Sequence, residues 1–144
     1  MSATGRTYRT KHSYDAAIRT TYRENIGKMY DFAKARKADF LLVFQPELGH
    51  KKVLSSIEQG MLQQWNATYK YSDNKLPQKY GQLIKEAKSF CEQRGIVYLD
   101  LNEIPEFSNN PRTLFFDVVH PDEAGHELIA QKINEMIHSK FSSP

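Results

Sequence analysis

The chain has 144 residues, of which 40% are apolar and 26% charged, and its formal net charge is +3. These values are typical of one soluble globular domain that can bury a sizeable core. No apolar run approaches the roughly 20 residues that span a membrane, so we expect no membrane span. The single cysteine, Cys91, excludes an intrachain disulfide and is expected to be a buried, inert thiol. The N-terminus lacks the apolar segment of a signal peptide, and the compartment stays open.

The positive charge is concentrated in the N-terminal part of the chain. Residues 1–37 have a net charge of +6, from nine Lys or Arg minus three Asp or Glu. A basic surface can bind nucleic acid or an anionic membrane. Here Asp15, Glu24 and Asp31 alternate with the basic residues, and no nucleic-acid-binding motif accompanies them. We therefore interpret the segment as a solvated helix face and expect no nucleic-acid partner.

The first predicted elements are a helix and a buried strand. Apolar residues recur every three or four positions across residues 14–37, which predicts an amphipathic helix. Ser13 precedes this stripe and is expected to be the N-cap of the helix. Residues 40–44 form a continuous apolar run closed by Pro46, a pattern typical of a strand that is buried on both faces.

The middle of the chain predicts two further helices and a second strand. Residues 49–65 are weakly helical, and residues 66–77 are polar and turn-rich, as in a long surface loop. A second clear apolar stripe starts at Pro77 and stops at Gly95. Residues 96–101 alternate poorly, so we expect a second strand that is covered on both faces.

The order of these elements predicts an α/β fold with parallel strands and right-handed crossovers. We divide the chain into an N-terminal segment, residues 1–13, and an α/β region, residues 14–141. Together they form a single domain or the C-terminal part of one. Two buried strands do not make a stable sheet alone, and an unpaired apolar edge is a template for another chain. We therefore expect either a homodimer or an N-terminal partner segment that completes the sheet.

The stretch that carries most chemical information precedes the last predicted helix, which we expect to begin at Pro121. Asp117 and His120 have the i, i+3 spacing that brings a carboxylate to an imidazole in a helix-like turn. A general-base histidine needs such a carboxylate to fix its tautomer and to stabilise the imidazolium. Pro121 holds His120 at a rigid corner. An Asp-x-x-His pair is not specific, and His120 as a cap or an ordinary surface residue remains the alternative.

The sequence "FFDVVHPDEAGHELIAQKI" resembles the last block of the SGNH (GDSL-type) serine hydrolases, in which Asp-x-x-His-Pro precedes a C-terminal helix. The resemblance covers residues 14–140 and implies a partial three-layer α/β/α sandwich with a parallel, flavodoxin-like sheet. It also implies that His120 is the general base and that Asp117 is its orienting acid. The implied activity is hydrolysis of a small ester or acyl group, as in esterases and acylhydrolases, without a metal or an organic cofactor.

The nucleophile block of that family is missing from this chain. No Gly-Asp-Ser occurs, no glycine is followed by Asn-Asp, and there is no G-x-S-x-G elbow. We therefore interpret the chain as the C-terminal portion of an SGNH-type hydrolase, supplying the Asp–His pair of the triad, and expect the isolated chain to be inactive. The alternative is a non-catalytic binding or assembly module of the same ancestry.

Two other patterns are weaker. The segment from Ser72 to Lys75 superficially contains S-D-N and S-x-x-K, but K-T-G is absent, and a surface loop is the better interpretation. Glu47-x-x-His50 and Glu123-x-x-His126 have the spacing of carboxylate-bridged di-metal bundles. Such sites need long facing helices and two more glutamates, so no metal site is predicted.

Overall fold

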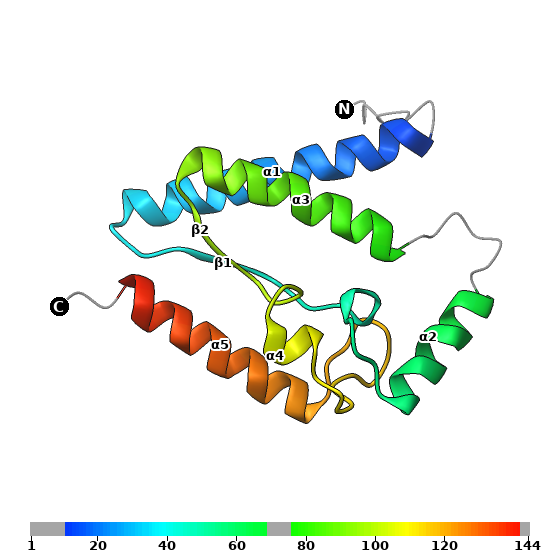
Figure 1. Cartoon of the computed structure of the whole chain (residues 1–144). Coiled ribbons are helices and arrows are strands. Elements are labelled where there is room, and N and C mark those ends of the chain that lie inside the picture. The colour runs from blue at the N-terminus through cyan, green and yellow to red at the C-terminus, as the bar shows by residue number, and fades with distance from the viewer. Residues whose placement is uncertain (1–10, 69–75, 142–144) are drawn as a thin grey trace, which may run out of the picture.

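The computed structural model describes residues 11–68 and 76–141 (Figure 1). The elements follow one another in the order α1 (Lys11–Ala35), β1 (Leu41–Phe44), the 3-10 turn η1 (Leu48–His50), α2 (Ser56–Thr68), α3 (Leu76–Arg94), β2 (Val97–Asp100), α4 (Pro105–Ser108) and α5 (Glu123–Phe141).

The two strands form a parallel pair between two layers of helices. Leu41 of β1 lies opposite Val97 of β2, and Phe44 lies opposite Asp100. Helices α1 and α3 run together on one side of the strands, and α5 lies on the other side (Figure 1). The predicted α/β class, a partial three-layer sandwich with parallel strands, is confirmed.

A first core fills the space between the strands and helices α1 and α3. Its buried members come from all four elements and their ends: Ile26, Phe44, Ile84, Ala87, Cys91 and Ile96. Cys91 is fully buried, as predicted. Burial raises the pKa of the Cys91 thiol to about 11, so the thiol stays protonated near neutral pH.

A second core lies between η1, α4, α5 and the loop that leads to α5. Its buried members are Leu48, Phe107, Leu114, Phe115 and Val118. The rings of Phe107 and Phe115 meet edge to face, with centroids 5.5 Å apart. The side chains of Phe115 and Val118 anchor the segment that carries Asp117.

Several predicted boundaries differ from the structure. Helix α1 begins at Lys11, so Ser13 lies inside the helix, and the prediction that Ser13 is the N-cap is wrong. Helix α2 continues to Thr68, where the side chain donates a hydrogen bond to the Gln64 carbonyl (2.9 Å), so the predicted loop is helical at its start. The rest of that loop, including Ser72, lies outside the described residues.

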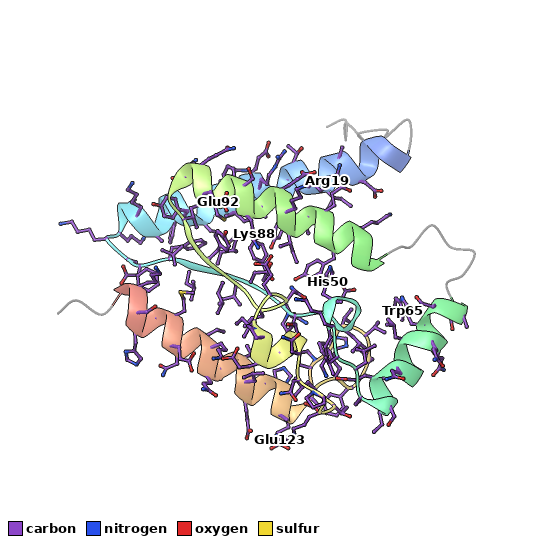
Figure 2. The ribbon with its side chains drawn as sticks, in the orientation of Figure 1. Arg19, His50, Trp65, Lys88, Glu92 and Glu123 are labelled. Atoms are coloured by element: carbon purple, nitrogen blue, oxygen red, sulfur yellow. The ribbon has the colours of Figure 1, made fainter. Side chains whose placement is uncertain are left out.

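The last helix begins later than the sequence suggested. It starts at Glu123, not at Pro121 (Figure 2). Asp122 caps it, because its Oδ1 accepts a hydrogen bond from the Gly125 N–H at 2.8 Å. The short helix α4 was not predicted from its Pro-rich and Asn-rich surroundings.

The strands are less covered than the sequence predicted. In β1, Phe44 is buried, but the three preceding residues are only partly buried. Within residues 11–68 and 76–141 the sheet contains two strands, and β1 pairs on one edge only. Helix α1 also exposes three large apolar side chains: Ile18, Met29 and Phe32.

The basic N-terminal segment is a helix face with ion pairs. Arg19 lies 2.8 Å from Glu86 of α3, and Asp31 pairs with Arg94 at the end of the same helix. These ion pairs connect α1 to α3. No helix in the described part of the chain is both long and apolar enough to cross a membrane.

Candidate active site

Asp117 and His120 are in contact, as their spacing predicted. Nδ1 of His120 lies 2.8 Å from Oδ2 of Asp117. The other carboxylate oxygen, Oδ1, accepts hydrogen bonds from the backbone N–H groups of Val119 (2.9 Å) and His120 (2.8 Å). The carboxylate is therefore held by the loop backbone and cannot rotate away from the imidazole without breaking three hydrogen bonds.

The electrostatics of the pair follow from these contacts. The hydrogen bond from His120 holds the pKa of Asp117 below its ordinary value, and the two backbone N–H donors lower it further. Asp117 is therefore ionised at neutral pH. When the Nδ1–H group of a neutral His120 donates its hydrogen bond to Asp117, Nε2 is left as a hydrogen-bond acceptor. The imidazole side chain is 70% exposed, so Nε2 is open to a reactant.

The loop that carries the pair is closed by a short antiparallel bridge. Phe115 and Pro121 form the bridge, and the Phe116 N–H donates to the His120 carbonyl at 2.8 Å. Gly125 makes the closure possible: a Cβ atom there would lie 2.5 Å from the Leu114 carbonyl oxygen. Only glycine lets α5 approach the loop this closely.

The end of β1 fixes the loop from the other side. The Gln45 side chain donates a hydrogen bond to the Val119 carbonyl at 2.7 Å, and the Leu48 N–H donates to the Val118 carbonyl at 3.0 Å. The Gln45 carbonyl in turn accepts from Tyr80 Oη (2.7 Å) and Asn102 Nδ2 (3.1 Å). The pair therefore lies at the carboxyl ends of the parallel strands, where α/β sites are found.

A buried ion pair holds the chain just before the loop. Lys51 Nζ lies 2.6 Å from Glu58 Oε2, with side-chain exposures of 1% and 0%. Glu58 also accepts from the Leu114 N–H (2.9 Å), and Lys51 donates to the Arg112 carbonyl (2.6 Å). Glu58 and Ser55 form a capping box at the start of α2, because each accepts a hydrogen bond from the backbone N–H of the other.

A hollow opens beside His120, which we call the His120 hollow. Its volume is about 320 Å³, and it is lined by Val43, Gln45, Pro46, Leu101, His120, Pro121, His126 and Ile129. Most of these walls are apolar, so the hollow suits an apolar group next to the imidazole.

The other sequence candidates are not part of this pair. Glu123 and His126 lie in the first turn of α5, where His126 Nδ1 lies 2.9 Å from the Asp122 carbonyl oxygen. Glu47 and His50 do approach each other, with Oε2 and Nδ1 3.2 Å apart. Among the described residues no group of three or more His, Cys, Asp or Glu side chains could hold a metal ion.

Two positioning residues, Gln45 and Glu58, were missed by the sequence analysis, whereas Gly125 fits the pattern of the resembling family's C-terminal helix. The Ser55-x-x-Glu58 pattern is a recognisable capping box and could have predicted the start of α2. The contacts of Glu58 with Leu114 and of Gln45 with Val119 join segments 56 and 74 residues apart, which no local pattern reveals.

Comparison with known proteins agrees with the geometry. The family model for GDSL-like Lipase/Acylhydrolase matches residues 5–133, which is most of the chain. The chain therefore belongs to the GDSL-like lipase/acylhydrolase family and is a domain of SGNH hydrolase type. It matches no curated protein sequence at a significant level.

Proposed function

We propose that this chain supplies the general base of an SGNH-type hydrolase that acts on a small ester or acyl group. His120 would be the base, and Asp117 would be the acid that orients it. The observation that carries the proposal is the 2.8 Å contact between His120 Nδ1 and an Asp117 carboxylate that two backbone N–H groups hold in place. The same relation orients the histidine of a catalytic triad.

In the proposed reaction, Nε2 of His120 takes the proton of a serine hydroxyl as its oxygen attacks the carbonyl carbon of the substrate. The ionised Asp117 stabilises the imidazolium that results. The imidazolium then returns the proton to the departing alcohol, and an acyl-serine remains. Water, activated by the same base, attacks the acyl-serine and releases the acid. The apolar His120 hollow fits a short acyl chain or the carbon skeleton of a leaving group.

In this proposal the serine and the oxyanion-hole donors come from outside the chain, since the sequence contains no Gly-Asp-Ser block. Such donors are indispensable, because one of them contributes about 2.7–4 kcal/mol to transition-state stabilisation. We propose that they belong to a polypeptide segment that pairs with the open edge of β1. The second candidate function is a non-catalytic binding or assembly module, and the missing block is the observation that favours it.

The isolated chain provides a direct test. Turnover of an activated short-chain ester should not exceed that of a His120→Ala variant, because the nucleophile is absent. Matched Ser13→Ala and Ser72→Ala variants test whether a serine of this chain has been overlooked. Turnover that is clear in the natural chain and lost in either serine variant would show that the nucleophile lies within these 144 residues.

A further inference from the structure

A buried carboxylate lies close to the Asp117–His120 loop but has no role in the proposed hydrolysis. Glu47 follows β1 and is only 5% exposed. Its Oε2 atom is buried and makes no hydrogen bond within the described residues. His50 Nδ1 lies 3.2 Å away, but the two groups are not aligned for a hydrogen bond, and this ring nitrogen is also unsatisfied. Buried carboxylates are normally paired, so this one calls for a partner.

Glu47 lines a small hollow, which we call the Glu47 pocket. Its volume is about 200 Å³, and its walls are Gln45, Pro46, Glu47, Tyr80 and Val119. The Tyr80 ring is fixed because its hydroxyl donates to the Gln45 carbonyl at 2.7 Å. The ring also meets the His50 imidazole edge to face, with centroids 6.0 Å apart (Figure 2 labels His50 between η1 and α3). The pocket thus combines one carboxylate, one aromatic ring and two apolar side chains.

The Tyr80 hydroxyl in the pocket wall stays protonated near neutral pH. Burial raises the pKa of Tyr80 far above its ordinary value, and the nearby Tyr22, Asp100 and Glu47 raise it further. Tyr80 is therefore neutral, and its ring presents an ordinary phenol face. The carboxylate of Glu47 is then the acidic group of the pocket that can attract a cation.

The Glu47 pocket adjoins the His120 hollow. Both are lined by Gln45 and Pro46, and Val119, a wall of the first, directly precedes His120, a wall of the second.

We propose that the Glu47 pocket binds a small organic ammonium group. A carboxylate beside an aromatic face is the combination that recognises alkylammonium ions, since the charge meets the carboxylate and the ring attracts the cation. Pro46 and Val119 provide apolar contacts for the alkyl groups. A neutral alkyl group of the same size would leave the buried carboxylate uncompensated. Among the described residues no Lys or Arg side chain pairs with Glu47, and the basic group beside it is the His50 imidazole, whose Nδ1 lies 3.2 Å from Oε2.

Binding can be measured without any hydrolysis, so the test is independent of the proposed function. The full ¹⁵N-labelled chain is titrated with tetramethylammonium chloride, and amide chemical shifts are recorded, with sodium chloride at equal ionic strength as the reference. We expect saturable shifts at the amides of Glu47, Tyr80 and Val119. In Glu47→Gln, which keeps the shape and removes the charge, the affinity should fall about tenfold or more. The matched control is Glu127→Gln on the exposed side of α5, which should bind as the natural chain does.

A second titration guards against a Glu47→Gln variant that does not fold. The natural chain is titrated with tert-butanol, a neutral molecule of similar size, which should produce no saturable shift at these amides. Equal binding of both molecules would mean a merely apolar hollow and would overturn the proposal. So would shifts that match sodium chloride, as expected if the pocket holds water only, or affinity that survives unchanged in a folded Glu47→Gln variant.

Discussion

Nδ1 of His120 lies 2.8 Å from Oδ2 of Asp117, while Oδ1 of the same carboxylate accepts two backbone N–H groups of the loop. The carboxylate is thus oriented by the backbone, and it in turn orients the imidazole. This order matters for mutation, because removal of the imidazole leaves the carboxylate in place. Removal of the carboxylate leaves the imidazole without its orienting partner.

The pKa of Asp117 should report the pair directly. In the natural chain we expect the Asp117 carboxyl to titrate below the ordinary value of about 3.9, because His120 and two backbone N–H groups stabilise its charged form. His120→Ala should raise the pKa toward that value without restoring it fully. Carboxyl ¹³C chemical shifts against pH measure both, and identical titrations in the two proteins would contradict the pairing.

The lowered pKa of Asp117 also determines how the stability of the chain depends on pH. A carboxyl whose pKa is lowered by folding stabilises the folded chain above its unfolded pKa, and this contribution is lost as the pH falls through the folded pKa. The free energy of unfolding should therefore decline below about pH 4 more steeply in the natural chain than in Asp117→Asn. Urea denaturation at a series of pH values gives the comparison.

Gly125 should tolerate no side chain. The Cβ of Gly125→Ala would meet the Leu114 carbonyl oxygen at 2.5 Å and the Pro121 Cβ at 2.9 Å, so the loop or the helix must shift. We expect a loss of about 1–3 kcal/mol in the free energy of unfolding. Gly60→Ala in α2 is the matched control, because nothing lies within 4 Å of the added Cβ. It should stabilise the chain by about 0.5–1 kcal/mol, and equal effects at the two sites would argue against this close approach.

The buried Lys51–Glu58 pair should show strong coupling. Glu58→Gln keeps the acceptor for the Leu114 N–H but leaves the buried Lys51 without a counter-charge, which should cost about 3–5 kcal/mol. Adding Lys51→Met to this variant should recover part of the loss, because no unpaired charge remains. Denaturation of the natural, single and double variants forms a double-mutant cycle. Strictly additive effects would show that the two charges do not interact.

Local patterns in the sequence predicted what depends on neighbouring residues. The apolar stripes predicted α1 and α3, and the apolar run before Pro46 predicted β1. The spacing of Asp117 and His120 predicted their hydrogen bond. The observed start of α5 differs from the predicted one because the Asp122 side chain caps the helix. The hydrogen bonds that Gln45 and Glu58 make with the loop could not be predicted, because both residues are distant from the loop in the sequence.

The open edge of β1 and the exposed side of α1 lead to a prediction about assembly. Phe32 is 61% exposed on α1, and the described sheet has two strands only. We expect the chain to form a homodimer or to bind a partner segment, and Phe32→Glu to weaken that association. Ile57→Glu, at a similarly exposed position of α2, is the control and should have little effect. Sedimentation at micromolar concentration measures the mass, and a monomer that melts cooperatively would contradict this view of the sheet.

The central claim is that His120 acts as the base for a serine that lies outside this chain. The most direct measurement is kcat/KM for a short-chain ester, taken on the chain together with the polypeptide segment that carries a Gly-Asp-Ser block, whether encoded upstream of Met1 or recovered as a partner. His120→Ala should lower kcat/KM by about 10³-fold or more, and Asp117→Asn by a comparable factor. Undiminished hydrolysis in His120→Ala, or the absence of any such segment upstream or among bound partners, would contradict the claim.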